Sequence, residues 1–463
     1  MEGIQRSRVS RRQFVALSSA LLATGCSGAG AMSAGDGRRE LRVAVVSNPQ
    51  MKDMQKLVGE FERQNPDLRV RFVTLPENQA RDKITQSVAT ESGQFDVVMV
   101  SNYETPIWAN NGWLQDLEPH IARTPGYDRD DIITPIRDSL TYRGRLHAVP
   151  FYGEGSLMMY REDLFERAGL RMPQQPTWEQ IADFAEKLDD KSAGRSGICL
   201  RGLPGWGECM SPVNTVLNAF GGRWFDPAWN AQLTSPEVRS GIGFSVDLVR
   251  RHGQVGASGH GFTECLTQFS QGDAAMMYDA TSAAGTLEDP AESTVAGRIG
   301  YVRAPLGPAR PTSWLYTWAL AVPNTCERPE DAWRFLAWAT SKDYVQVVGR
   351  RKSWQALPPG SRTSTYRLPE YQRAAGVFAG PSLEAISTAD QDHPTARPVP
   401  YVGLQFLRIP EFVDLGTLVS QQISAAIAGN KPVDEALPSA RTPCHRRSRR
   451  STAARRSGSR PSS

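Results

Sequence analysis

The stretch LRVAVVSNPQMKDMQKLVGEFERQNPDLRVRFV, residues 41–73, decides the fold of this chain. Its apolar ends, residues 41–46 and 70–73, predict two buried strands, and residues 53–64 between them repeat apolar side chains at helical spacing. A third apolar run, FDVVMV, follows at residues 95–100. Strands that alternate with helices are typical of a parallel sheet covered on both faces, so the pattern predicts an α/β fold.

Helix signals continue through the rest of the body, from about residue 41 to residue 437. Thr177 and Gln180 have the spacing of a capping box, and Ser235 with Pro236 marks the start of a helix that Gly253 ends. A body of this length is large enough for two domains with full cores.

The ends and the middle of the chain differ in charge. The formal net charge is +4, but residues 441–463 hold eight arginines and no acid, and residues 1–25 hold four arginines and one acid. The body is therefore acidic, with about seven negative charges in excess, which argues against a nucleic acid as partner.

The N-terminus has the layout of an export signal. Residues 1–25 combine arginines, a short apolar run and small residues, and Arg11 with Arg12 resembles a twin-arginine motif. Cys26 ends a sequence that resembles a lipobox, although Ala23 stands where leucine is usual. We expect a protein that is lipid-anchored at Cys26 outside the cytoplasmic membrane, with residues 26–39 as a flexible tether. A plain signal peptide or an ordinary N-terminal anchor is the alternative.

The C-terminal residues 439–463 are rich in Arg, Ser and Pro, and we expect them to be disordered. Two interpretations stay open. The tail is either a basic arm for nucleic acid or a membrane surface, or the product of a frameshift that replaced a closing helix after Leu437.

No cysteine or histidine pattern predicts a metal site or a cofactor. Cys199 and Cys209 are close enough in sequence to form a disulfide, and two buried thiols are the alternative.

Short polar side chains follow the predicted strands of the first half. Asn48, Glu77 and Asn102 stand at such points, where open α/β sheets bind their ligands. They are suited to hydrogen bonds with a neutral polar ligand, although such residues also cap helices or form turns.

The second half places aromatic rings beside carboxylates and arginine. The residues concerned are Tyr152, Glu154, Arg201, Trp206, Glu208, Asp279, Trp314 and Trp318. Aromatic faces cover the C–H patches of a polyhydroxylated ligand, while charged groups bond its hydroxyls in pairs. For Trp314 and Trp318, which alternate on a predicted strand, ordinary core packing is the alternative.

Several stretches carry a resemblance to a known family. They are GQFDV at 93–97, SNYETPIW at 101–108, AVPFYGE at 148–154, GICLRGLPGWGE at 197–208, FGGRWFD at 220–226, DAT at 279–281, WALAVP at 318–323, PYVGLQF at 400–406 and IPEF at 409–412. In their order, they resemble the extracellular solute-binding proteins of ABC sugar importers, most closely the sugar-alcohol (mannitol/sorbitol) branch. The resemblance covers residues 41–437.

The resemblance implies a two-lobed periplasmic-binding-protein fold of class II, each lobe a mixed sheet flanked by helices, with the ligand in the cleft. The first lobe would take residues 40–149 and 312–345, and the second residues 150–311 and 346–438. A monomer would bind a polyol or small sugar and deliver it to the permease subunits by closing the cleft. The implied binding residues are Asn48, Glu77, Asn102, Tyr152, Glu154, Arg201, Trp206, Glu208, Asp279, Trp314, Trp318, Tyr401 and Gln405.

Tyr278 departs from the family pattern, since relatives usually carry an apolar or tryptophan-like residue there.

Two further classes of protein remain. A secreted glycoside hydrolase would use Glu154, Glu208 or Asp279 as its pair of carboxylates, and a surface-adhesion protein would use the basic tail. Neither a GxSxG elbow nor a P-loop is present, and we expect a binding protein and no catalysis.

Overall fold

The structure, a computed structural model, describes residues 37–357 and 360–438. A five-stranded sheet contains the stretch that decides the fold, and its strand order is β2-β1-β3-β10-β6. The strands are β1 (Arg39–Val46), β2 (Leu68–Leu75), β3 (Val97–Ser101), β10 (Tyr316–Ala321) and β6 (Val149–Glu154). The predicted strands at 41–46, 70–73 and 95–100 correspond to β1, β2 and β3.

The first sheet is mixed rather than purely parallel. β1 pairs in parallel with both β2 and β3, as the alternating pattern predicts. β10 then pairs antiparallel with β3 on one side and β6 on the other. The local pattern misses this arrangement because β10 returns from a distant part of the chain.

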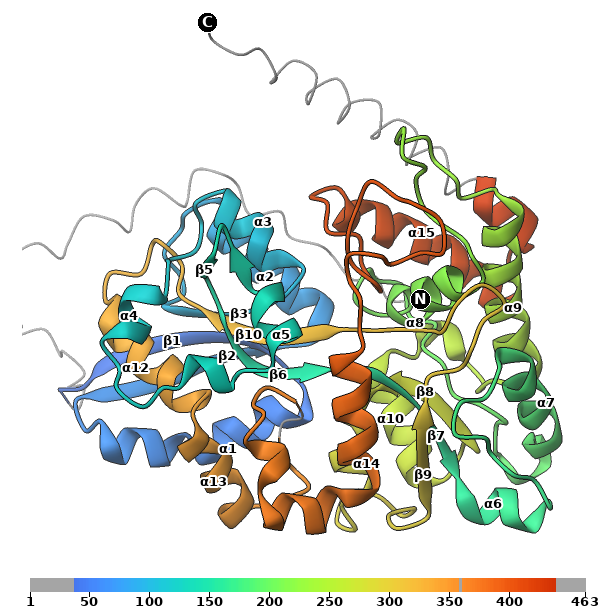
Figure 1. Cartoon of the computed structure of the whole chain (residues 1–463), viewed down its shortest axis with the longest axis horizontal. Coiled ribbons are helices and arrows are strands. Elements are labelled where there is room, and N and C mark those ends of the chain that lie inside the picture. The colour runs from blue at the N-terminus through green and yellow to red at the C-terminus, as the bar shows by residue number, and fades with distance from the viewer. Residues whose placement is uncertain (1–36, 358–359, 439–463) are drawn as a thin grey trace, which may run out of the picture. The chain divides into compact units, whose positions relative to one another are not determined.

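Helices cover this sheet and complete the first lobe, as we call the sheet with the elements packed around it (Figure 1). They are α1 (Pro49–Gln64), α2 (Glu77–Ala89), α3 (Glu104–Asn110), α4 (Glu118–Ala122), α5 (Thr134–Ser139), α12 (Pro329–Ala339) and α13 (Lys342–Arg351), with the hairpin β4 (Thr141–Tyr142) and β5 (Arg145–Leu146). α1 begins where Asn48 Oδ1 accepts a hydrogen bond from Met51 N, and it buries Met54 and Phe61 against the sheet.

A second sheet forms the core of the second lobe. Its strands are β7 (Ser156–Arg161), β8 (Met276–Ala280) and β9 (Ile299–Arg303), in the order β8-β7-β9. All three pair antiparallel, and Ser196 and Cys199 add parallel bridges beside β8. The surrounding helices are α6 (Glu162–Arg167), α7 (Trp178–Leu188), α8 (Met210–Ala219), α9 (Pro236–His252), α10 (Phe262–Gln271), α11 (Ala284–Leu287) and α15 (Phe412–Ile427). The predicted capping box of Thr177 and Gln180 starts α7.

The chain passes between the lobes three times, and the third passage, residues 352–411, leads from α13 to α15. Gly155 alone separates β6 from β7, and residues 304–315 connect β9 to β10. α14 (Pro369–Ser387) packs against β6 of the first sheet and against β7 and β9 of the second. A Cβ atom at Gly155 would lie 2.6 Å from Ala385 Cβ, so only glycine allows this helix to approach the crossing. The first sheet extends through β6 to Glu154, five residues beyond the boundary expected at residue 149.

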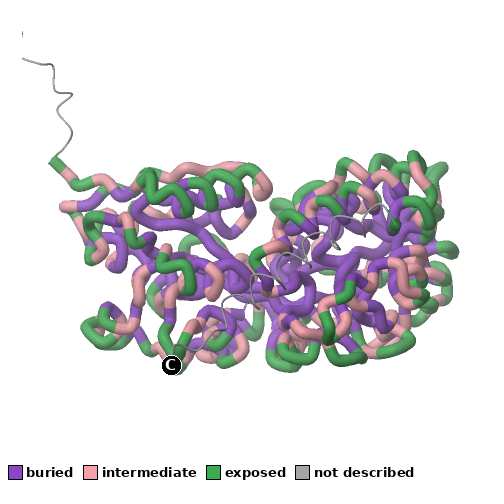
Figure 2. The backbone as a smooth tube through the Cα atoms, turned by 90° about the horizontal axis from the view of Figure 1, so that it is seen from above, coloured by how far each residue is buried: buried purple, intermediate pink, exposed green. Residues whose placement is uncertain are grey.

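Burial follows the sheets: the strands are buried and the outer faces of the helices are exposed (Figure 2). Cys199, Cys209, Cys265 and Cys326 are all buried free thiols, so Cys199 and Cys209 are small core residues here. In the described part of the chain, no helix combines the length and apolarity that crossing a bilayer requires. Arg11, Arg12, Cys26 and the tail at 439–463 lie outside the described residues.

Candidate ligand-binding cavity

A cavity lies where the two lobes meet, at the ends of β6 and β10. All lining residues except Glu77 and Phe262 are buried. The lining consists of Asn48, Glu77, Arg81, Tyr152, Glu154, Arg201, Gly207, Ser211, Phe262, Ser282, Trp314, Tyr316, Trp318 and Phe406.

The pairing of β6 with β10 builds one wall. Tyr316 lies opposite Glu154 and Trp318 lies opposite Tyr152 in the antiparallel register. Side chains two residues apart on a strand share a face, so both pairs project into the cavity, and Trp314 precedes the same strand on that face. Aromatic surface thus alternates with polar atoms along the wall.

The first-lobe side is formed by residues that follow β1 and β2. Asn48 caps α1 and lines the cavity, and its Nδ2 donates to Tyr152 OH across 3.0 Å. Glu77 opens α2 and lines the cavity, where its Oε1 accepts from Arg81 Nη2 at 2.8 Å. Two of the three predicted strand-end residues therefore meet at the cavity.

Arg81 is buried and enclosed on every side. Its guanidinium contacts Glu77 at 2.8 Å and Glu104 at 3.3 Å, and it also donates to Tyr316 OH. The same group lies 4.1 Å from the ring centroid of Trp206 and 4.6 Å from that of Trp318. Two carboxylates and two indole faces together hold this cation in place.

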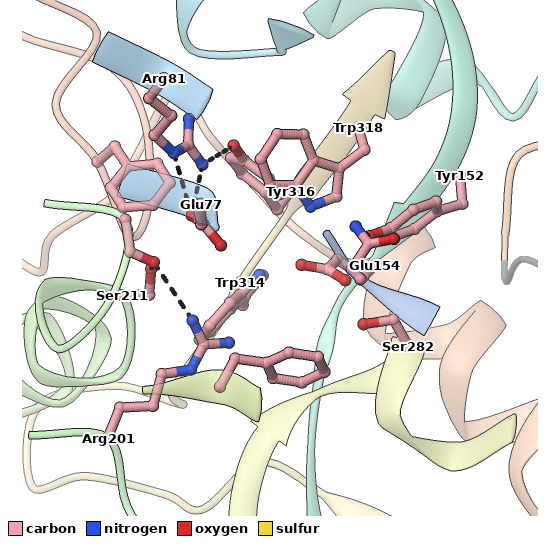
Figure 3. A pocket seen from close by; sticks show the side chains of 14 residues that line it. Glu77, Arg81, Tyr152, Glu154, Arg201, Ser211, Ser282, Trp314, Tyr316 and Trp318 are labelled. Carbon is pink, nitrogen blue, oxygen red and sulfur yellow. Dashed lines mark hydrogen bonds and ion pairs between the residues drawn. The ribbon is translucent and has the colours of Figure 1, made fainter. Parts of the chain in front are cut away.

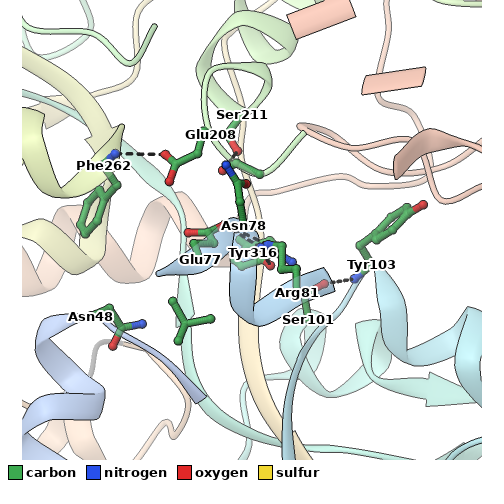
Figure 4. Close-up of polar contacts among 12 residues, drawn as sticks. Asn48, Glu77, Asn78, Arg81, Ser101, Tyr103, Glu208, Ser211, Phe262 and Tyr316 are labelled. Carbon is green, nitrogen blue, oxygen red and sulfur yellow. Dashed lines mark hydrogen bonds and ion pairs between the residues drawn. The ribbon is translucent and has the colours of Figure 1, made fainter. Parts of the chain in front are cut away.

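Arg201 is a second fully paired cation. It donates from Nε to Asp279 Oδ2 at 2.8 Å and from Nη2 to the other oxygen of the same carboxylate. Glu208 lies 3.6 Å from Arg201 Nη1 and accepts a hydrogen bond from Phe262 N (Figure 4). Asp279 and Glu208 thus support Arg201 from behind, and Arg201 lines the cavity.

The opposite side of the cavity contains polar groups without such partners. Tyr152, Glu154 and Ser282 gather there, facing Arg81 and Arg201 across the cavity (Figure 3). Glu154 is only 4% exposed, and burial raises its pKa to about 8, against weaker effects of Ser282 and Arg201. Trp314 Nε1 is buried, has no hydrogen-bond partner among the described residues and points toward this side (Figure 3). A bound molecule with hydroxyl groups would form hydrogen bonds with both the Glu154 carboxyl and Trp314 Nε1.

Direct contacts join the lobes around the cavity. Gln50 Nε2 donates to Ser282 O at 3.1 Å, and Asn78 Nδ2 donates to Pro204 O at 3.4 Å. Tyr103 OH donates to Ile409 O at 2.7 Å. A Cβ atom at Gly207 would lie 2.5 Å from Glu77 Oε1, so a side chain there would block this approach. The lobes are therefore closed on each other.

Seven of the thirteen predicted binding residues line the cavity, and six do not. Those that line it are Asn48, Glu77, Tyr152, Glu154, Arg201, Trp314 and Trp318. Those that lie behind the lining are Asn102, Trp206, Glu208, Asp279, Tyr401 and Gln405.

Besides Glu208 and Asp279, three of those six form side-chain hydrogen bonds with the backbone. Asn102 accepts from Thr317 N, and Gln405 Nε2 donates to Leu315 O. Tyr401 OH accepts from Trp224 N.

Sequence reasoning missed seven lining residues: Arg81, Gly207, Ser211, Phe262, Ser282, Tyr316 and Phe406. Two of them had a signal. Tyr316 shares the strand face of Trp314 and Trp318, and Arg81 lies one helical turn after Glu77. Tyr278, the departure from the family pattern, lies outside the cavity, where its hydroxyl contacts Ser156 and Thr215.

Two α/β lobes that close on a polar cavity define a class of proteins that bind small solutes by hinged closure. The sequence profile of the family described as "Bacterial extracellular solute-binding protein" matches residues 47–346, and the chain belongs to this family. It is 42% identical over 405 residues to the mannitol-binding protein of Pseudomonas aeruginosa. The aligned region covers 87% of this chain and 92% of that protein.

Solved structures give the same picture. An ABC transporter solute-binding protein from Agrobacterium vitis with bound D-mannitol is 45% identical, with a TM-score of 0.87 over 89% of this chain and 99% of that one. A solute-binding protein from Agrobacterium radiobacter in complex with ribitol is 25% identical, with a TM-score of 0.77 over 88% of this chain and 98% of that one.

These similarities confirm the predicted two-lobed fold and the resemblance to the solute-binding proteins of ABC importers. They also confirm the prediction of a binding protein instead of a glycoside hydrolase, because these relatives bind solutes. As a member of an extracellular family, the protein works outside the cytoplasm.

Proposed function

We propose that this protein binds an open-chain sugar alcohol, with a hexitol such as mannitol as the first candidate, and delivers it to an ABC permease. The observation that carries the proposal is the 42% identity to a mannitol-binding protein along 92% of that protein's length. A mannitol-bound structure at 45% identity supports it, and the cavity is lined by the polar and aromatic side chains that suit a polyol.

In this proposal, the lining residues divide the recognition of the polyol between them. Glu77 and Glu154 accept hydrogen bonds from hydroxyl groups, while Asn48, Tyr152 and Trp314 Nε1 are further partners. Trp314 and Trp318 cover the C–H faces of the carbon chain. Trp206, Glu208 and Asp279 act indirectly, by holding Arg81 and Arg201 in position. Asn102 and Gln405 hold the backbone of residues 315–317 through hydrogen bonds, and Tyr401 holds the backbone at Trp224.

Closure of the lobes is the proposed mechanism of transport. A ligand that contacts both lobes binds the closed state better than the open state, so it shifts the hinge equilibrium toward closure. We assign residues 40–149 and 312–345 mainly to the first lobe, extended through β6, and residues 150–311 and 346–438 mainly to the second. The permease then senses the closed form.

The proposed location follows from the N-terminal sequence. Export through the Arg11–Arg12 motif and acylation of Cys26 would tether a monomer to the outer face of the cytoplasmic membrane. Tethering raises the effective concentration of the protein near its permease. Residues 26–39 would serve as the tether.

Calorimetric titration of the purified protein with mannitol, sorbitol, xylitol, arabitol, glucose, trehalose and maltose tests the proposal. We expect tight one-to-one binding of a sugar alcohol, weaker binding of glucose and no binding of the disaccharides. Absence of binding to every sugar alcohol, from protein shown by circular dichroism to be folded, contradicts the proposal. Mass spectrometry of the recovered protein tests acylation at Cys26 separately.

A further inference from the structure

The charged groups at the cavity do not balance. Two cations, Arg81 and Arg201, face five carboxylates that line the cavity or contact these arginines. The carboxylates are Glu77, Glu104, Glu154, Glu208 and Asp279. With all of them ionised, three negative charges remain uncompensated, in a region that is largely shielded from water.

The imbalance is unevenly distributed. Arg81 is shared by Glu77 and Glu104, and Arg201 is shared by Asp279 and Glu208. Glu154 forms no ion pair in the described residues, although it is 4% exposed. A buried carboxylate without a cation is costly, and the raised pKa of Glu154, about 8, reflects that cost. Glu154 is therefore the place where a positive charge would bring most relief.

The surroundings of Glu154 are rich in oxygen atoms. Ser282 and Tyr152 lie on the same side of the cavity (Figure 3), and Tyr152 OH already accepts from Asn48 Nδ2, which leaves the oxygen a second lone pair. Trp314 Nε1 is buried, finds no partner in the part of the chain that the structure describes, and points toward the same space, where a ligand can supply an acceptor. The site is thus built for a ligand that donates and accepts at this position.

We propose that the cavity also takes protonated amino alditols, which are open-chain polyols with an ammonium group in place of one terminal hydroxyl, and that the ammonium binds at Glu154. The inference rests on the proposed polyol-binding function and widens its substrate class. The same charges exclude aldonates, in which the terminal group is a carboxylate.

The size and the hydrogen bonding of an ammonium group, compared with those of a hydroxyl, support its binding at Glu154. An ammonium group replaces a hydroxyl with little change in volume and offers three donors, for which Glu154, Ser282 and Tyr152 provide oxygen acceptors. Burying an ammonium group is costly unless it is paired, and Glu154 supplies an otherwise unpaired partner. An aldonate carboxylate would instead add a further negative charge to a cavity in which carboxylates already outnumber arginines, and it would find no unpaired cation there to offset the cost of its burial.

Calorimetric titration of the full chain at neutral pH tests the inference with D-mannitol, 1-amino-1-deoxy-D-mannitol and D-mannonate. We expect the amine to bind within about tenfold of mannitol or more tightly, and mannonate to bind at least about 100-fold more weakly than mannitol. In Glu154→Gln the amine should lose at least about tenfold more affinity than mannitol does, because only the amine loses an ion pair. Glu166→Gln, on the exposed face of α6, is the matched control and should change neither affinity.

The outcomes separate this inference from the proposed function. If mannitol binds and the amine does not, the inference is overturned and the polyol function stands. Equal losses of both ligands in Glu154→Gln, from folded protein, also overturn it. Ser282→Ala provides a second test if Glu154→Gln does not fold, since it should again weaken the amine more than mannitol. Binding of the amine without mannitol would support the inference and contradict mannitol as the transported solute.

Discussion

The two sides of the cavity neutralise their charges in different ways. On one side, Arg81 and Arg201 are each held by two carboxylates before any ligand arrives. On the other side, Glu154 is buried without an ion pair in the described residues, and Trp314 Nε1 has no partner. The paired side is preorganised and fixes the shape of the cavity. The unpaired side leaves the Glu154 carboxyl and Trp314 Nε1 for the ligand and therefore decides what is recognised.

The largest expected effect comes from breaking the paired side. Asp279→Ala leaves the buried Arg201 without its bidentate partner, and we expect the free energy of unfolding to fall by about 3–5 kcal/mol. Urea denaturation measures the loss. Asp183→Ala is the control, since its partner Lys187 is half exposed and the pair should contribute less than about 1 kcal/mol. Equal losses in the two variants would contradict the structural role of the Arg201 pair.

On the unpaired side, stability should depend on pH. The folded protein raises the pKa of Glu154 from 4.5 to about 8, chiefly through burial, so it holds this proton more tightly than the unfolded chain does. The contribution of Glu154 is complete below pH 4.5 and is lost as the pH rises toward 8, at a slope approaching about 1.4 kcal/mol per pH unit.

Urea denaturation of the protein without ligand, at pH 5 and pH 8, measures this loss. Glu154→Gln should reduce the difference between the two pH values, because glutamine does not titrate. Glu166→Gln should keep the wild-type difference. A pH dependence that is the same in all three proteins would mean that Glu154 is ionised throughout this range.

A smaller effect is expected where the paired side meets the second lobe. Trp206 stacks on Arg81 at 4.1 Å and packs on Tyr103, so it links the cation of the first lobe to a loop of the second. We expect Trp206→Ala to weaken polyol binding by about tenfold, or about 1.4 kcal/mol. Calorimetry measures the change, and Trp113→Ala, whose ring packs on Trp108, should leave affinity intact.

The smallest effect concerns Asn48, which serves both the fold and the cavity. Asn48→Ala removes the cap of α1 and should cost about 1 kcal/mol of stability. Asn48→Asp retains the capping oxygen but loses the Nδ2 donor to Tyr152, so stability should recover while ligand affinity stays reduced. Thermal unfolding and calorimetry on both variants separate the two roles. If affinity recovers together with stability, the contact with Tyr152 does not contribute to the site.

The strand ends show how far the sequence can predict the site. Asn48 and Glu77 follow β1 and β2 and both line the cavity, as the rule for open sheets predicts. Asn102 follows β3 and does not line it, because β10 pairs alongside β3 and the Asn102 side chain bonds to Leu315 and Thr317. Local pattern cannot predict this pairing, since β10 comes from a distant segment.

The charged residues show why tertiary packing limits the prediction of the site. Asp279 and Glu208 were predicted to contact the ligand, yet both lie behind Arg201. Of these three residues, only Arg201 lines the cavity. The sequence indicates that an arginine and two carboxylates belong together, but the order of the layers depends on tertiary packing. Arg81 was missed although it lies one helical turn after Glu77, because the same spacing is also typical of an ordinary surface pair.

The contacts between the lobes also have a kinetic consequence. A molecule held in the cavity is covered while Gln50 contacts Ser282 and Asn78 contacts Pro204. Its residence time is then governed by how often the hinge beside Gly155 opens, a motion that typically takes microseconds to milliseconds. Two solutes of different affinity can therefore leave at similar rates once the lobes part, and a mutation far from the cavity that loosens the hinge can shorten the residence time of every solute alike.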